Sequence, residues 1–248
     1  MAGIGTRRRS RRGRAVVVLD RRTVDYDGRT YPLTLRRNPR ARRMILRLDK
    51  GEDGAVVTVP RGVAIADALA FAAAKRAWIA RRLDAVPARV PFVDGAKVPL
   101  QGRNRTIRHE GSGKGAVRGA GDEIWVRGAP ARVPALVTMW LKCEARRAIL
   151  ARVEPACRRL GKPAGRVVLR DPRTRWGSCA ASGNLSFSWR LIMAPAFVLD
   201  YVVAHEVTHL AQANHGAGFW RLVETLCDDV GKARDWLRVQ GRSLHRFG

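Results

Sequence analysis

The alternation of apolar and polar positions changes character about halfway along the chain. Between residues 15 and 60 the apolar residues come in short runs, AVVVLD, YPLTL, MILRL and AVVTV, and turn residues or proline lie between them. Runs of this length, rich in β-branched residues, are typical of β-strands. Asp27-Gly28 lies between two such runs and indicates a hairpin turn. We therefore predict a small antiparallel sheet over residues 15–60.

A helix and a second group of strands come next. Residues 63–86 are rich in alanine, with apolar residues three and four positions apart, which predicts one amphipathic helix ending before Pro87. Residues 91–128 return to short strand-like runs. The glycine-rich segment 111–121 lacks the spacing of a phosphate-binding loop, so we predict a hairpin loop there.

The rest of the chain has mainly helical periodicity. An apolar stripe with helical spacing begins near Val133 and continues to Leu160, where Gly161 provides a stop signal. Two strand candidates follow, RVVLRD and NLSFSWRLIM, with the turn-rich segment TRWGSCAASG between them. Further helices are predicted over about residues 195–213 and 217–240.

Charge and composition predict a basic N-terminal tail and attraction to polyanions. The chain has 48 Lys and Arg against 21 Asp and Glu, a net charge of +27. Residues 1–14 are basic and lack periodicity, which predicts a disordered tail. A field of this sign attracts polyanions, so we expect nonspecific attraction to nucleic acid. Aromatic residues make up only 6% of the chain, which gives no evident platform for stacking bases.

The sequence predicts a cytoplasmic protein that does not associate with membranes. No apolar run approaches the ~18 to 20 residues of a membrane-spanning helix. The run of five apolar residues after the basic start is shorter than the ~7 to 15 of a signal-peptide core. The four cysteines form no Cys-x-x-Cys pair, so we expect free thiols rather than disulfides. Nothing in the sequence sets the oligomeric state.

The clearest chemical signal is a His-Glu-x-x-His motif within a helical pattern. His205 and His209 are four residues apart and therefore project from one face of a helix. At this spacing two imidazole nitrogens can reach one zinc ion at about 2.0 to 2.1 Å. Glu206 is displaced around the helix, where it can accept a proton from an attacking water. His215 follows His209 by six residues and is the predicted third ligand.

Other ligand sets remain open at this point. Glu224 competes with His215 as the third ligand, and Cys179 is a candidate fourth ligand that would favour a structural zinc site. The six-residue step equals that of the metzincins. However, Gln212 occupies the position of their glycine, and no methionine follows the site, so we do not assign the chain to that group.

Two longer stretches make the chain resemble the YgjP-like metallopeptidase family, which is related to the SprT-like and WLM zincin groups. They are RTRWGSCAASGNLSFSWRLIMAP and DYVVAHEVTHLAQANHGAGFW. The N-terminal segments RRNPRARRMILRLDKG, VTVPRG and AKRAWIARRL extend the resemblance to about residues 30–240. The family's metal ligands and its glutamate match four residues here: His205, His209, His215 and Glu206. The family commonly has other residues at the positions of Val207 and Thr208, which are not ligand positions.

The pattern and the resemblance together predict an α+β fold. We expect a β-rich N-terminal unit with one helix over residues 15–130, and a zincin-like helical half with a small sheet over residues 131–248. The resemblance implies a zinc-dependent metallopeptidase acting on polypeptide substrates, with Glu206 as the base. Arg175 is a second catalytic candidate, because a guanidinium can pair with a substrate carboxylate, a phosphate or a developing oxyanion.

Two alternative functions come from other classes. The positive charge would suit a metal-dependent nucleotide pyrophosphatase or phosphohydrolase, since fold alone does not determine function. The same charge would also suit a nucleic-acid-associated protein in which zinc is structural. A closed fourth ligand position would favour that second alternative.

Overall fold

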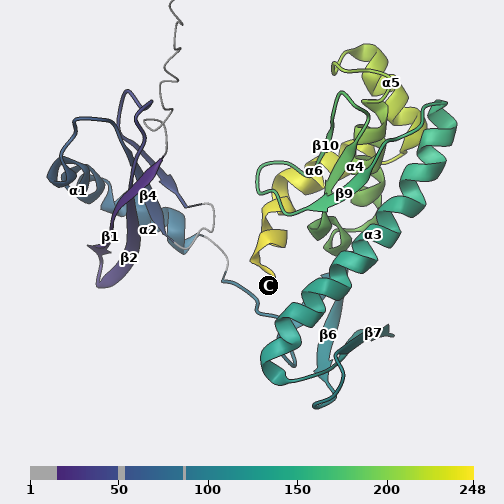
Figure 1. Ribbon diagram of the computed structural model, residues 1–248, viewed down its shortest axis with the longest axis horizontal. Coiled ribbons are helices and arrows are strands. Elements are labelled where there is room, and N and C mark those ends of the chain that lie inside the picture. The colour runs from purple at the N-terminus through teal and green to yellow at the C-terminus, as the bar shows by residue number, and fades with distance from the viewer. Residues whose placement is uncertain (1–15, 50–53, 86–87) are drawn as a thin grey trace, which may run out of the picture. The chain divides into compact units, whose positions relative to one another are not determined.

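The computed structural model describes residues 16–49, 54–85 and 88–248, which divide into two compact units (Figure 1). The first unit ends at Pro87, and the second is Ala88–Gly248. Each unit has its own hydrophobic core, and the two cores share no residue. The fold is α+β, as predicted. The basic tail predicted over residues 1–14 lies outside the described residues.

A four-stranded sheet forms the first unit, in the order β1-β2-β4-β3. The β1–β2 hairpin turns at Asp27 and Gly28, whose φ angles of 51° and 71° match the predicted turn. The sheet is not wholly antiparallel as expected, because β2 pairs with β4 in parallel. The strands are β1 (Val17–Tyr26), β2 (Arg29–Arg37), β3 (Ile45–Leu48) and β4 (Ala55–Val59).

Two short helices pack on this sheet, α1 (Ile65–Ala74) and α2 (Arg76–Asp84). The single helix predicted over residues 63–86 was therefore wrong. Lys75 interrupts it with φ −110° and ψ 16°, and its N–H donates to the Ala72 carbonyl, three residues back, at 3.0 Å. A bond to the third residue back tightens the last turn of a helix.

The second unit begins with a four-stranded sheet in the order β5-β6-β8-β7, which packs against the long helix α3 (Val133–Leu160). α3 has the predicted bounds and ends at Gly161, whose φ is 67°. Figure 1 shows β6 and β7 beside the first part of α3. The strands are β5 (Lys97–Leu100), β6 (Arg103–His109), β7 (Ala116–Ala120) and β8 (Glu123–Arg127).

The predicted boundary near residue 130 falls inside this second unit. Ile107 and Ile124 of the sheet belong to the same buried cluster as Leu136 and Leu141 of α3. Residues 128–129 and the short 3₁₀ helix η1 (Pro130–Arg132) separate β8 from α3. The sheet therefore relies on α3 to cover its apolar face, and the division of the chain lies at residues 87 and 88 instead.

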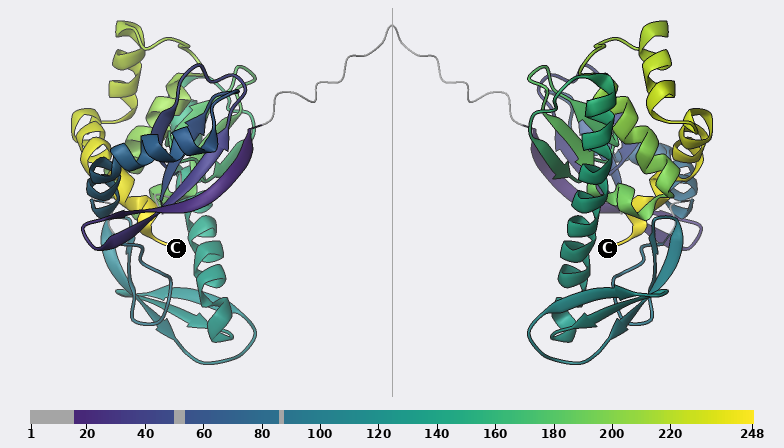
Figure 2. Two further views of the ribbon diagram at one scale, coloured as in Figure 1. Left: turned by 90° about the vertical axis from the view of Figure 1, so that its left-hand side faces the viewer. Right: turned by 90° about the vertical axis from the view of Figure 1, so that its right-hand side faces the viewer.

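A three-stranded sheet and three helices complete the second unit (Figure 2). The sheet has the order β10-β11-β9, and α4 packs against α3, α5, α6 and β10. The elements are β9 (Val167–Arg170), β10 (Gly177–Cys179), β11 (Leu185–Ser188), η2 (Trp189–Met193), α4 (Ala196–Thr208), α5 (Ala217–Leu226), α6 (Val230–Gln240) and η3 (Gly241–Arg246).

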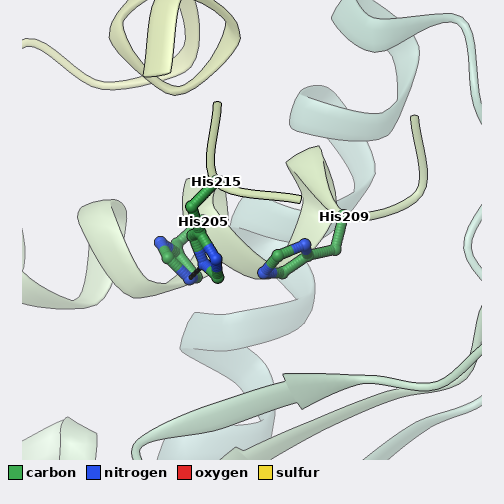
Figure 3. A group of neighbouring side chains, drawn as sticks. All are labelled: His205, His209 and His215. Carbon is green, nitrogen blue, oxygen red and sulfur yellow. Dashed lines mark hydrogen bonds between the residues drawn. The ribbon is translucent and has the colours of Figure 1, made fainter. Parts of the chain in front are cut away.

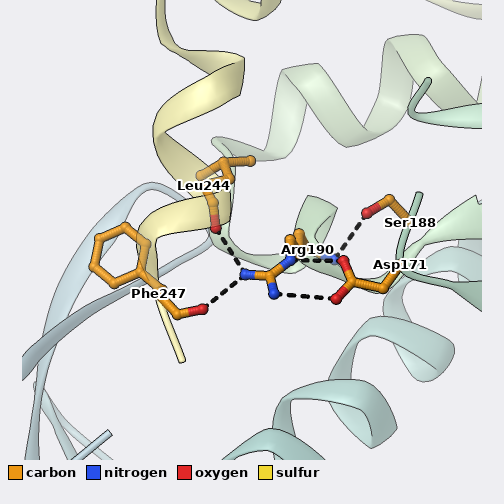
Figure 4. A network of polar contacts seen from close by, with 5 residues as sticks. All are labelled: Asp171, Ser188, Arg190, Leu244 and Phe247. Carbon is orange, nitrogen blue, oxygen red and sulfur yellow. Dashed lines mark hydrogen bonds and ion pairs between the residues drawn. The ribbon is translucent and has the colours of Figure 1, made fainter. Parts of the chain in front are cut away.

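Arg190 connects the C-terminal segment to the small sheet (Figure 4). Its buried guanidinium donates two hydrogen bonds to Asp171, at 2.7 and 3.0 Å, and further bonds to the Leu244 and Phe247 carbonyls, at 3.0 and 2.7 Å. Burial by itself would raise the pKa of Asp171, but the Arg190 guanidinium offsets this and leaves the pKa below its ordinary value. The pair therefore stays ionised at neutral pH and holds η3 in place.

Within the described ranges, every helix is too short or too polar to cross a lipid bilayer.

Candidate metal centre

The C-terminal end of α4 carries the His-Glu-x-x-His motif. The helix is anchored by a run of buried apolar residues that includes Val198, Val202 and Val203. α4 ends at Thr208, earlier than the predicted 195–213, but His209 keeps helical angles of φ −62° and ψ −16°. Because that conformation continues the helix by one residue, His205 and His209 still share a face. Their ring centroids lie 5.0 Å apart.

A tight turn after α4 brings the third histidine back to the first two. The amides of Ala211 and Gln212 both donate to the Thr208 carbonyl at 3.0 Å, which closes the turn. His215 then lies beside the helix end, with its Nε2 atom 3.1 Å from Nε2 of His205. Figure 3 shows the three imidazoles converging from α4 and the chain that follows it.

The donor atoms of these histidines can hold one metal ion. One ring nitrogen from each of His205, His209 and His215 lies within 4.8 Å of the other two. A tetrahedral zinc with ligands at about 2.0 to 2.1 Å needs nitrogens roughly 3.3 Å apart. The Nδ1 atom of His209 lies 3.0 Å from the Gln212 carbonyl oxygen, where an Nδ1–H would donate to it. In the neutral ring this bond places the proton on Nδ1 and leaves Nε2 free to bind a metal.

Aromatic side chains from α5 form one wall of the triad. The buried Phe219 ring lies 4.9 Å from the ring of His205, 4.7 Å from His209 and 4.6 Å from His215. Trp220 lies 6.0 Å from His215 and is itself covered by the guanidinium of Arg234. Packing against this wall limits the rotation of the imidazoles, so α5 positions the ligands without contributing one.

The environment of His205 favours the neutral ring that binds metals. Burial lowers the pKa of His205 to about 4, and the neighbouring His209 and His215 act in the same direction. Nδ1 of His205 lies 3.5 Å from the Tyr201 hydroxyl, one turn earlier on α4. The ring is therefore neutral at neutral pH, and its Nε2 faces Nε2 of His215.

Glu206 has the electrostatics of a general base. Its side chain is 7% exposed, and burial raises its pKa to about 7. The charge of Arg175 and the backbone amide of Cys179 act in the opposite direction and keep the pKa from rising further. A carboxylate with a pKa near the working pH can accept a proton and later release it.

Gly177 makes room for Glu206, a role that sequence reasoning did not assign. A Cβ atom at position 177 would lie 2.5 Å from Cγ and 2.6 Å from Oε1 of Glu206. Real Cβ atoms do not approach other atoms this closely, so the carboxylate occupies space that only a glycine leaves. The pattern of TRWGSCAASG indicated only a turn-rich segment, because the contact with Glu206 joins positions far apart in the chain and has no local signal.

Arg175 lies two residues before β10. It is exposed and forms no ion pair or hydrogen bond with the described residues, yet its charge acts on the Glu206 carboxylate. The structure therefore brings Arg175 near the base without engaging its guanidinium elsewhere.

The competing ligands lie outside the triad. Glu224 is exposed on α5 and does not belong to the cluster of donor atoms, and neither does Cys179. The predicted strand NLSFSWRLIM contains β11, which lies in the middle of its sheet, with β10 at the edge next to α4. Burial raises the pKa of Cys179, so its thiol is protonated at neutral pH.

The geometry defines the site as a three-histidine candidate metal centre with an adjacent buried glutamate. A family model, the YgjP-like metallopeptidase domain, matches residues 42–240. Because the match covers most of the chain, the protein belongs to the YgjP-like metallopeptidase family, as the sequence predicted. No curated protein and no solved structure matches the chain.

Proposed function

We propose that this protein is a zinc-dependent peptidase, with the metal held by His205, His209 and His215. The observation that carries the proposal is the convergence of three imidazoles beside a buried carboxylate, in a chain of a metallopeptidase family. Three nitrogen ligands are typical of catalytic zinc sites, which keep a position open for substrate or water.

The residues of the chain have separate roles in the proposed reaction. A bound zinc ion would polarise the scissile carbonyl and make water a better nucleophile near neutral pH. Glu206 accepts the proton of the attacking water and donates it to the leaving amine. Arg175 would stabilise negative charge on the substrate; its exposure and the lack of another partner among the described residues support this role.

The composition of the donor cluster argues against a structural zinc. Among the described residues, the cluster contains three histidines and no fourth His, Cys, Asp or Glu. Structural zinc sites are almost always closed by four protein ligands. The arrangement therefore favours chemistry at the metal over a purely structural role.

Substrate class is best tested with the metal-loaded protein and its Glu206→Gln variant. Both are assayed against casein and against nucleoside triphosphates, with metal content measured in parallel. We expect casein cleavage by the wild type, with a loss of about 10²- to 10⁴-fold in the variant at unchanged zinc content. Release of pyrophosphate or phosphate from triphosphates, without casein cleavage, would instead support the phosphohydrolase alternative.

A further inference from the structure

A basic pocket lies at the opposite end of α4 from the histidines. It encloses about 650 Å³ between the β5–β8 sheet, α3 and the first residue of α4, Ala196. Its charged lining consists of three arginines and one glutamate: Arg103, Arg105, Arg147 and Glu144. Ala196 and His205 are nine residues apart, so about 14 Å of helix separates this pocket from the candidate metal centre.

Two of the three guanidiniums are not neutralised by a carboxylate. Arg147 is paired with Glu144. The side chains of Arg103 and Arg105 form no ion pair or hydrogen bond with any residue in the described part of the chain, and Nε of Arg105 is buried without a partner. By contrast, Arg108 lies on the same strand as both and is paired with Glu123 at 2.8 Å. A buried, unsatisfied donor is costly unless a ligand satisfies it.

The start of α4 contributes one residue, Ala196, to the lining of the same pocket. α4 has 13 residues, and its N-cap is Pro195, which supplies no side-chain cap. The amide of Val198 bonds to the Pro195 carbonyl at 3.0 Å, whereas the amides of Ala196 and Phe197 have no partner among the described residues. Uncapped amides at a helix N-terminus carry partial positive charge and attract oxyanions.

We propose that this pocket binds the phosphate monoester group of a small molecule. The three arginines and one glutamate give a net charge of 3 − 1 = +2. A phosphate monoester carries about −1.5 to −2 at neutral pH, which matches this charge, whereas each diester of a nucleic-acid backbone carries only about −1. Guanidinium groups bind phosphate oxygens in pairs, which suits a pocket with several of them.

Calorimetric titration of the metal-loaded protein with inorganic phosphate at physiological salt tests the proposal. Arg103→Gln and Arg105→Gln each remove one charge from the pocket, and Arg108→Gln is the control because it removes one charge from the same strand outside the pocket. We expect each pocket variant to weaken binding about tenfold, as is typical for the loss of a charge-assisted bond. The control should bind within about twofold of the wild type.

Two further measurements separate this site from the metal centre and from nonspecific attraction. Binding of phosphate should persist in His209→Ala, because the pocket shares no residue with the triad. A fluorescein-labelled dT12 without terminal phosphate should show no difference between Arg105→Gln and Arg108→Gln. The proposal is overturned if Arg108→Gln loses as much phosphate affinity as Arg105→Gln, if binding vanishes in His209→Ala, or if only the oligonucleotide distinguishes the variants.

Discussion

At the scale of single residues, the contact between Gly177 and Glu206 is the sharpest constraint on the site. A Gly177→Ala substitution places a methyl group 2.5 Å from Cγ of Glu206, so the carboxylate must move. We expect hydrolysis to fall at least about 100-fold, since the base is displaced, while zinc content stays unchanged. Gly231→Ala on α6 is the matched control, because nothing lies within 4 Å of its added Cβ. Full activity in Gly177→Ala would mean that catalysis does not need this position of the carboxylate.

The identity of the third ligand is also decided at single residues. His215 lies with Nε2 3.1 Å from that of His205, whereas Glu224 is exposed outside the donor cluster. His215→Ala should therefore weaken zinc binding by at least about 100-fold, because a true ligand is lost, and Glu224→Ala should leave it nearly unchanged. Competition with a zinc chelator measures both affinities. The reverse order would assign the third ligand to glutamate.

At the scale of elements, η3 places a titratable group under the strand that carries Gly177. His245 stacks on Trp176 with ring centroids 5.3 Å apart, and its Nδ1 is buried without a partner. Burial lowers the pKa of His245 to about 4, and the Arg190 charge acts in the same direction, against Asp171. Below pH 6.5 His245 is therefore protonated in the unfolded chain but stays neutral in the folded chain. Stability is lost as the pH falls from 6.5 towards 4.

Replacing His245 removes this source of pH dependence. We expect His245→Phe, which keeps the stacking on Trp176, to lose less stability between pH 7 and pH 5 than the wild type does. Thermal unfolding of both metal-free proteins across this range gives the measurement, with pH 7.5 as the reference at which the wild-type ring is neutral. Equal slopes for the two proteins would mean that His245 does not contribute to acid destabilisation.

Local sequence patterns predicted the elements better than their partners. Helical periodicity and the stop signal at Gly161 predicted α3 at its observed bounds, and the four-residue spacing placed His205 and His209 on one face. The parallel pairing of β2 with β4 could not be predicted, because a strand's own pattern does not specify its neighbour. The role of Gly177 was hidden for the same reason, since the contact with Glu206 exists only after β10 packs on α4.

At the scale of the whole molecule, the separation of the two cores predicts that the second unit can act alone. All three histidines and Glu206 lie in Ala88–Gly248, as do all residues of the larger core. We expect a fragment starting at Ala88 to fold and to bind about one equivalent of zinc, because its ligands do not depend on the first core. Circular dichroism and metal analysis of the purified fragment provide the check. An unfolded fragment would show that the first unit is needed for stability.

The boundary between the two units was the feature that the sequence pattern predicted least accurately. The pattern changes from strands to helices near residue 130, and the predicted boundary followed that change. However, a sheet with an apolar face needs a covering layer, and here α3 provides it for β5–β8. The change from strands to helices near residue 130 therefore lies about 40 residues after the boundary between the two cores, which is at residue 87.

The close approach of Gly177 to Glu206 also limits which substitutions the chain can accept during evolution. The two positions are separated by 206 − 177 = 29 residues, yet the space near the base holds only one side chain. As long as position 206 carries a glutamate, any residue other than glycine at position 177 would collide with it. A lineage that abandons the glutamate releases position 177 at the same moment, so the two sites should be inherited as a pair.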